Sequence, residues 1–280
     1  MADLISVIIT TYNREDALAA VLRALAQQTD KNFEAVVADD GSQQRTAATV
    51  EEWRGRVPFP LIHVWHEDRG FRASEIRNRA ILASRGAYCI FLDGDCIPRP
   101  DFIAAHRRLA ERGWFVTGNR ILMSQELTSA VLQQRLQPEH WSFADWVRLR
   151  LRRRINRLAP LLRLRLGPLR KLRAQAWRGA RSCNLAAWRA DLDKVDGFDA
   201  AFSGWGREDS DLLIRLLHGG VRRKGGEFAT GVLHLWHVEA DRARLPRNDQ
   251  ELARCRSERR VRAQAGLSTL QTRMLPSEPP

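Results

Sequence analysis

Several features common in other protein classes are scarce or missing in this sequence of 280 residues. It has only four cysteines, which are widely spaced and lack the paired spacing of a metal site (Cys89, Cys96, Cys183 and Cys255). A disulfide-stapled scaffold is therefore excluded, and we expect reduced thiols. No apolar run approaches the ~20 residues that a membrane-spanning helix needs. The first apolar run, 4–9, is too short for a signal-peptide core and has no basic lead-in, so we expect a cytoplasmic protein.

Negative charge is missing from one long segment of the chain. No Asp or Glu occurs from 146 to 190, whereas 148–173 holds a dense series of arginines interleaved with leucines. Over the whole chain, 46 Lys and Arg residues oppose 33 Asp and Glu residues, which gives a formal net charge of +13. A surplus of this size predicts a polyanionic neighbour such as nucleic acid, anionic lipid or a phosphorylated glycan.

Apolar runs that suit β-strands alternate with stretches of helical periodicity through the first 120 residues. We expect strands at 4–9, 33–38, 61–65, 87–92 and 114–119, and helices near 18–25, 46–53, 74–84 and 101–112. This alternation predicts an α/β fold whose mostly parallel central sheet is flanked by helices.

The pattern changes after residue 120 and returns later in the chain. A basic amphipathic helix is expected from Trp141 to Ile155, followed by shorter pieces broken at Pro160, Gly167 and Pro168. The α/β pattern resumes at 181. We therefore expect one domain over 1–240, made of halves 1–120 and 181–240 with a basic helical insertion at 121–180. For the tail, 241–280, we expect one charged helix (248–264) and a disordered proline-rich end.

Two aspartates directly follow the strand expected at 87–92. In sheets of this kind, ligands bind at the carboxyl ends of the strands. Asp93 and Asp95 are separated by Gly94, so two carboxylates can lie on one tight turn. Mg²⁺ and Mn²⁺ accept such oxygen ligands and can complete their shell with substrate phosphates. A surface turn without a metal is the alternative interpretation of this motif, and the preceding apolar strand makes it the less favoured one.

A second acidic cluster follows an aromatic residue between two glycines. Trp205 stands between Gly204 and Gly206, and Glu208 and Asp209 come directly after. Sugars stack on tryptophan, and a nearby carboxylate can accept the proton of an attacking hydroxyl. Asp209 is our candidate base, and Glu208 is expected to orient the acceptor or cap a helix. An acid-rich first helical turn, favoured by the helix dipole, is the simpler explanation for Asp211.

Two histidines lie near the end of the α/β pattern. His234 and His237 follow a short strand-like run, and imidazole is a good ligand for Mn²⁺ and similar ions. One of them is expected to complete the metal site begun by Asp95, although a single histidine here would be better explained as structural.

Polar residues also end the first two expected strands. Thr10 and Asp40 could bond the edge of a nucleotide base, and Arg77 and Asn78 could approach the same nucleotide. Taken alone, the Asp-Asp-Gly-Ser sequence at 39–42 is only a turn.

Several of these segments together resemble family 2 glycosyltransferases of GT-A fold. The resemblance rests on the sequences SVIITTYNR at 6–14, VADDGS at 37–42, RNRAI at 77–81 and FLDGD at 91–95. The stretch 183–209, which ends in GWGRED, resembles the carboxyl half of galactosyltransferase-type enzymes.

The resemblance implies inverting transfer from a nucleoside-diphosphate sugar, usually UDP-linked. Thr10 and Asp40 would bind the base, with Tyr12, Asn13 and Arg14 on the same nucleotide-sugar surface. Asp93 would lie near ribose and metal, and Asp95 and His237 would ligate Mn²⁺ or Mg²⁺. Asp209 would be the base. His234 falls where some relatives use a methionine ligand.

The resulting expectation is an enzyme that adds a hexose or N-acetylhexosamine to a hydroxyl of a bacterial lipopolysaccharide or capsule glycan. For the basic segment 141–180 three interpretations stay open: a peripheral helix on the anionic inner face of the cytoplasmic membrane, a groove for a phosphorylated acceptor, or a solvated arginine-rich hairpin. In the first, Trp141, Phe143, Trp146 and leucines would dip into the membrane interface. Two other classes remain as alternatives. One is an arginine-rich nucleic-acid-binding protein, which lacks any familiar binding motif, and the other is a non-catalytic scaffold of GT-like fold.

Overall fold

The computed structural model describes residues 3–239 and 241–274 and contains a central sheet of seven strands in the order β3-β2-β1-β4-β8-β6-β9. The strands of this sheet are β1 (Ile5–Thr11), β2 (Phe33–Asp39), β3 (Leu61–Trp65), β4 (Tyr88–Asp93), β6 (Trp114–Thr117), β8 (Asn184–Trp188) and β9 (Arg222–Gly225). β8 runs antiparallel to both of its neighbours, and the other pairs are parallel. The predicted mostly parallel sheet is confirmed.

The register of the parallel strands brings their polar ends level with one another. Thr10 of β1 is opposite Asp93 of β4, and Thr11 is opposite Asp39 of β2. Residues that are 28 and 83 positions apart in the sequence therefore meet at one edge of the sheet, as expected for a doubly wound fold.

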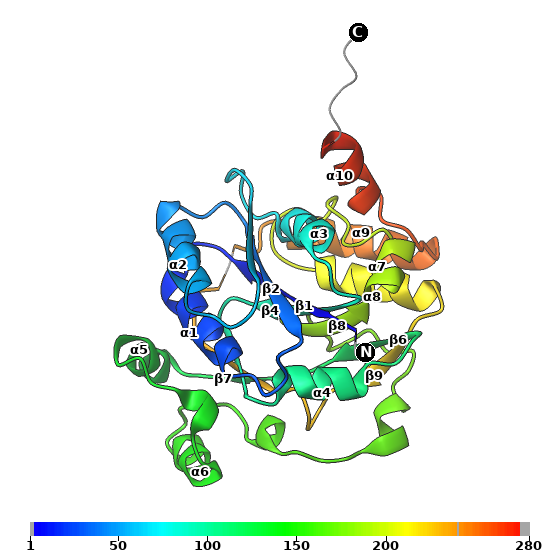
Figure 1. The fold of residues 1–280 in the computed structure, drawn as a ribbon. Helices are drawn as coiled ribbons and strands as arrows, with labels where there is room; N and C mark the ends of the chain where they lie inside the picture. Colours follow the sequence, from blue (N-terminus) through cyan, green and yellow to red (C-terminus); the bar gives the residue numbers. More distant parts are fainter. Residues whose placement is uncertain (1–2, 240, 275–280) are drawn as a thin grey trace.

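Helices cover both faces of this sheet, so its central strands are buried on both sides (Figure 1). One apolar layer includes α1, α4 and α5, and the other includes α3, α7, α8 and the start of α10. The helices are α1 (Glu15–Ala26), α2 (Gln44–Arg54), α3 (Ala73–Ala83), α4 (Phe102–Leu109), α5 (Gln125–Gln133), α6 (Phe143–Leu151), α7 (Arg189–Lys194), α8 (Glu208–His218), α9 (Leu245–Ser257) and α10 (Leu267–Met274).

A small second sheet brings the histidine motif to the aspartate pair. It consists of β5 (Cys96–Pro98), β10 (Val232–His234) and β7 (Arg120–Leu122), with β10 in the middle. His234 is paired with Cys96, and the Leu235 N–H donates to the carbonyl of Asp95. The chain near residue 234 is thus held beside Asp95 by backbone hydrogen bonds.

The basic segment 141–180 is less helical than predicted. The helix expected over 141–155 is limited to α6, which begins with a capping box formed by Ser142 and Asp145. Arg153 has a φ of 56°, a left-handed conformation that cannot continue an α-helix. In the fully described stretch from 152 to 183, only two 3₁₀ turns occur, Ala159–Leu161 and Gly167–Lys171, each with a proline in its first turn.

The aromatic residues of the basic segment are not all available to a membrane. Trp146 is buried in the core layer under α6, and Trp141 packs on it with ring centroids 5.2 Å apart. Phe143 is exposed, as are several leucines (Leu151, Leu162, Leu164, Leu169 and Leu172). The predicted role of Trp146 at a membrane interface is therefore wrong.

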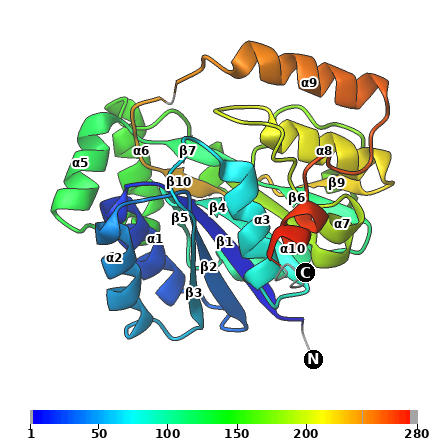
Figure 2. The same ribbon diagram turned by 90° about the horizontal axis from the view of Figure 1, so that it is seen from above.

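The tail forms two helices where one was predicted. α9 ends at Ser257 because Arg259 turns the chain with a φ of 50°, and α10 follows. Leu267 is buried in the layer that includes α3, and α9 lies alongside α8 (Figure 2). Residues 275–280, predicted to be disordered, lie outside the described residues. In the described part of the chain, no helix has the length and apolarity needed to cross a membrane.

Candidate active site

Asp40, which is expected to bind the nucleotide base, is held by hydrogen bonds to both of its carboxylate oxygens. Its Oδ1 is 2.7 Å from Nε2 of His66, and its Oδ2 accepts a 2.9 Å hydrogen bond from the backbone N–H of Arg72. The carboxylate is buried and fixed, which suits recognition of a base edge. His66 and Arg72 were not predicted as site residues, because they lie in a loop with no periodic pattern.

The β1–α1 loop lies over the turn that follows β2. Asn13 has a φ of 46°, donates its backbone N–H to Oγ of Ser42 at 2.8 Å and accepts from the Gln43 N–H at 2.9 Å. Asn13 therefore joins two loops rather than presenting a free amide. Tyr12 is 49% exposed, and its hydroxyl donates to Asp68 at 2.9 Å.

The Asp93-Gly94-Asp95 turn packs tightly against β1. The Gly94 N–H donates to the carbonyl of Thr10 at 2.7 Å, and a Cβ on Gly94 would lie only 3.0 Å from that oxygen. Glycine is thus needed for this close approach rather than for a special φ. The two carboxylates are held beside the end of β1, as predicted.

The predicted metal ligands converge on Asp95. One of its oxygens is 3.6 Å from Nε2 of His234, and the other is 3.4 Å from Nε2 of His237. Burial, followed by the charge of Arg120, lowers the pKa of His234 to about 4, so its imidazole is neutral at pH 7 and keeps a lone pair. Burial also raises the pKa of Asp93 and of Asp95, because removal from water disfavours the charged carboxylate. A bound cation would favour the charged form and so offset this effect. This set of carboxylates and imidazoles fits Mn²⁺ or Mg²⁺.

Arg77 connects the two acidic clusters instead of lying free for a nucleotide. Its guanidinium reaches Asp93 at 3.4 Å and Glu208 at 3.3 Å, and its Nε donates to Oγ1 of Thr10 at 3.0 Å. The side chain is only 5% exposed. Burial opposes its charge, but Asp93 and Glu208 raise the pKa of Arg77. A buried guanidinium group therefore holds Asp93 and Glu208 together.

Asn78 does not lie where it was expected. It is fully buried, its Nδ2 donates to the carbonyl of Phe198 at 2.7 Å, and its Oδ1 accepts from the Phe198 N–H at 2.8 Å. Both amide atoms fasten α3 to the loop before α8, so we assign Asn78 a structural role.

Glu208 and Asp209 begin α8 and differ in their surroundings. Burial and the neighbouring charge of Asp209 raise the pKa of Glu208 to about 7. Asp209 is half-buried, and its Oδ1 accepts from the backbone N–H of Ser210 at 2.6 Å, which leaves Oδ2 for a ligand. Asp211 is fully buried against Arg215 at 2.7 Å, in agreement with its interpretation as a structural residue.

The Gly204-Trp205-Gly206 loop is held by the tail of the chain. Asn248 of α9 is buried and donates its amide to the carbonyls of Ser203 at 3.2 Å and Gly206 at 2.8 Å. Trp205 is covered by Arg242, whose guanidinium carbon lies 5.0 Å from the ring centroid. Sequence reasoning missed Asn248, although its spacing to the buried Leu252 and Cys255 places all three on one helix face.

Two cysteines lie directly behind the aspartate pair. Sγ of Cys96 is 3.6 Å from Oδ1 of Asp95, and Sγ of Cys183 is 3.6 Å from a guanidinium nitrogen of Arg120. The candidate ligand atoms of Asp93, Cys96 and Cys183 all lie within 4.8 Å of one another. The sequence spacing of the cysteines gave no sign of this cluster, because its members are far apart in the chain. Burial raises the pKa of Cys96, which keeps it a neutral thiol.

Comparison with sequence families gives two adjoining matches. The family model described as Glycosyl transferase family 2 matches residues 6–176, more than half of the chain. A model described as N-terminal domain of galactosyltransferase matches residues 171–238. The two matches meet near the end of the basic segment.

Curated relatives are similar over most of the chain. A validoxylamine A glucosyltransferase of Streptomyces hygroscopicus subsp. limoneus is 30% identical over 233 residues, which cover 78% of this chain and 49% of that protein. A hyaluronan synthase of Pasteurella multocida is 27% identical over 237 residues, or 77% of this chain and 23% of the synthase. The chain thus spans about half the length, or less, of these relatives.

Solved structures share the fold. S. aureus TarS 1-349 matches with a TM-score of 0.61 at 17% identity, covering 95% of this chain and 67% of that one. The mannosyltransferase PcManGT from Pyrobaculum calidifontis matches with a TM-score of 0.59 at 18% identity, covering 100% of this chain and 67% of that one. With the family match and the mostly parallel sheet, these likenesses show that the chain belongs to glycosyltransferase family 2 and has a GT-A fold.

Proposed function

We propose that this protein is an inverting, metal-dependent glycosyltransferase that uses a nucleoside-diphosphate sugar. The observation that carries the proposal is the convergence of Asp95, His234 and His237 on one side of Arg77, with Glu208 and Asp209 on the other. A cation site and a candidate base on one sheet edge are what transfer from a sugar diphosphate requires.

Each group would have a distinct task. Asp40 would accept from the base and Tyr12 would flank it, while Asp93 would lie near the ribose. Asp95 and His237, with His234, would hold Mn²⁺ or Mg²⁺, which when bound stabilises negative charge on the diphosphate leaving group.

Asp209 would take the proton of the acceptor hydroxyl as its oxygen attacks C1 from the face opposite the diphosphate. The C1–O bond to the diphosphate breaks as the new glycosidic bond forms. Trp205 offers a stacking face for a sugar, and Glu208, tied to Arg77, keeps Asp209 in position.

The structural neighbours support a sugar nucleotide as donor. S. aureus TarS 1-349 is described in complex with UDP-GlcNAc, and PcManGT in complex with GDP-Man and Mn²⁺. We propose a UDP-linked hexose or N-acetylhexosamine as donor and a hydroxyl of a bacterial surface glycan, such as lipopolysaccharide or capsule, as acceptor.

A thermal-shift screen tests this proposal. UDP-, GDP- and dTDP-sugars are each added with and without Mn²⁺, because a ligand that binds only the native state raises its stability by mass action. We expect a Mn²⁺-dependent rise in Tm with one donor, and a smaller rise in the Asp95→Asn variant. If no donor shifts the Tm, the site is not a sugar-nucleotide site.

We also propose that the basic segment 141–180 associates with an anionic membrane surface. Five of its leucines are exposed beside arginines, a combination that suits the interface of an anionic bilayer. Vesicle flotation at low salt should recover the protein with anionic lipid but not with neutral lipid. Absence of flotation with both would remove this proposal.

A further inference from the structure

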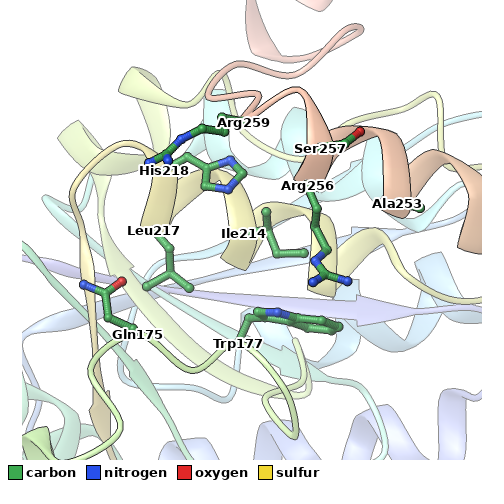
Figure 3. A pocket seen from close by; sticks show the side chains of 9 residues that line it. All are labelled: Gln175, Trp177, Ile214, Leu217, His218, Ala253, Arg256, Ser257 and Arg259. Atoms are coloured by element: carbon green, nitrogen blue, oxygen red, sulfur yellow. The ribbon is translucent and has the colours of Figure 1, made fainter.

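A cavity of about 620 Å³ lies at the end of α8 that is distant from Glu208. It opens between α8, α9 and the chain at 175–177, and its lining includes Gln175, Trp177, His218, Arg256, Ser257 and Arg259 (Figure 3). A neighbouring hollow of about 380 Å³ shares Trp177 and Arg256 and adds Arg173 and Arg178. None of these residues belongs to the site described above.

The charge around this cavity is uncompensated. In the described chain, none of the four guanidinium groups of Arg173, Arg178, Arg256 and Arg259 has a carboxylate within the 4.0 Å of an ion pair. By contrast, Arg254 of the same helix pairs with Glu251 at 2.8 Å. Arg256 and Arg259 line the larger cavity, and Arg173, Arg178 and Arg256 line the smaller hollow beside it. Guanidinium groups without a carboxylate partner favour an anionic ligand, and guanidinium binds carboxylates by paired hydrogen bonds.

Trp177 gives the cavity a rigid aromatic surface. Trp177 is half-buried, and it packs against two separate clusters of buried apolar residues. The guanidinium carbons of Arg178 and Arg256 lie 5.4 Å and 5.7 Å from its ring centroid. An indole flanked by two cations suits a sugar ring that carries a negative charge, because the ring stacks while the charge pairs.

Further hydrogen-bonding groups complete the lining. Nδ1 of His218 is 2.8 Å from the carbonyl of Arg260. A carbonyl only accepts, so Nδ1 carries a proton and donates it to this carbonyl. With the amide of Gln175 and the hydroxyl of Ser257, the cavity offers both donors and acceptors for sugar hydroxyls.

The cavity and the catalytic groups lie at opposite ends of the same two helices. From Glu208 to Leu217 the rise along α8 is about 14 Å at 1.5 Å per residue. On α9, Asn248 holds the Trp205 loop, whereas Arg256 lines the cavity. One bound chain of several sugar units could therefore reach from the cavity to Asp209.

We propose that this cavity is a remote subsite that binds a carboxylate-bearing sugar unit of the acceptor glycan. The proposal rests on the glycosyltransferase function proposed above. The proposal adds that the acceptor is an acidic polysaccharide and that one of its sugar units binds at a place separate from the catalytic groups.

Calorimetric titration without donor tests the subsite. The probe is a hexasaccharide of alternating uronic acid and N-acetylhexosamine, and a neutral chitin hexasaccharide is the matched control. We expect the acidic probe to bind more tightly, and the Arg178→Gln/Arg256→Gln double variant to lose about tenfold or more in affinity. Arg254→Gln, on the same helix but paired with Glu251, should leave the affinity unchanged.

The donor thermal shift separates this inference from the proposed function. The double variant should keep the full Mn²⁺-dependent shift, since both arginines are remote from Asp95. A missing donor shift in the unmodified protein would reject the glycosyltransferase function, while the titration would still report on the cavity. Equal binding of both hexasaccharides, or unchanged binding by the double variant, would overturn the subsite. The subsite would also be overturned by a third result. In it, the unmodified protein binds anionic vesicles but not the acidic hexasaccharide, and the double variant no longer binds the vesicles.

Discussion

Two regions of the molecule carry opposite charges, and these charges are balanced in different ways. One is the acidic edge of the sheet, formed by Asp93, Asp95, Glu208 and Asp209, and the other is the basic segment 141–180. At the edge, Arg77 is buried between Asp93 and Glu208. In the basic segment most arginines are exposed, and Arg150 has no carboxylate partner within the described chain. Desolvated charges are strongly coupled to one another and to stability, whereas solvated ones are screened. Arginine thus joins buried carboxylates in one region and stays mostly solvated in the other.

The largest expected effect is on the buried side of this comparison. Arg77→Met should lower the free energy of unfolding by about 3 to 5 kcal/mol, because it leaves Asp93 and Glu208 buried without their cation. Urea denaturation monitored by circular dichroism measures the change. A loss below 1 kcal/mol would show that the three charges are not coupled as described.

Asp95→Asn should weaken donor turnover by about 100-fold or more, since it removes a negative charge from the proposed metal site beside the leaving group. Donor consumption measured over a range of Mn²⁺ concentrations checks this. Saturating Mn²⁺ should not restore the rate. Full recovery of the rate at high Mn²⁺ would mean that Asp95 contributes affinity alone.

One arginine of the basic segment is buried, and we expect its replacement to lower the free energy of unfolding as the replacement of Arg77 does. Arg170 is buried and donates to the carbonyls of Leu164, Gly225 and Glu227 at 2.7 to 2.8 Å. Arg170→Gln should cost about 1 to 3 kcal/mol of unfolding free energy, because it leaves buried carbonyls unpaired. The matched Arg150→Gln change should stay within about 0.5 kcal/mol. Equal effects of the two changes would erase the distinction between buried and exposed arginines.

A smaller effect is expected in the pH dependence of stability. The pKa of Glu208 is raised to about 7 from an ordinary value of 4.5, so between these values the folded state binds more protons than the unfolded state. The free energy of unfolding should therefore fall as pH rises from about 5 to 7. Glu208→Gln should make this part of the profile flatter. An unchanged slope would place the titrating group elsewhere.

The predictable part of the molecule is the part whose elements are fixed by a buried core. β1 and β4 are buried on both faces, so the sequence predicted their apolar runs and the polar residues at their ends, and the family resemblance placed Asp95 near His237. Asn78 was misassigned because a motif does not reveal which amide atoms the fold occupies.

The remaining errors involve contacts between distant segments. The role of Asn248 depends on α9 crossing the Trp205 loop, and the closeness of Cys96 to Cys183 depends on how β5 and the start of β8 approach. In the basic segment, the arginine and leucine pattern suggested a long helix, but the left-handed conformation of Arg153 follows the end of α6 at Leu151, and the later prolines begin only short 3₁₀ turns. Local periodicity could not show that Arg170 would turn inward.

The most direct test compares donor affinity and sugar transfer in Asp209→Asn and in the unmodified protein. We expect the donor dissociation constant in the presence of Mn²⁺ to stay the same and transfer to fall by about 100-fold or more, because only the proton acceptor has been removed. Unimpaired transfer in Asp209→Asn would contradict the assignment of the acidic edge as the catalytic centre.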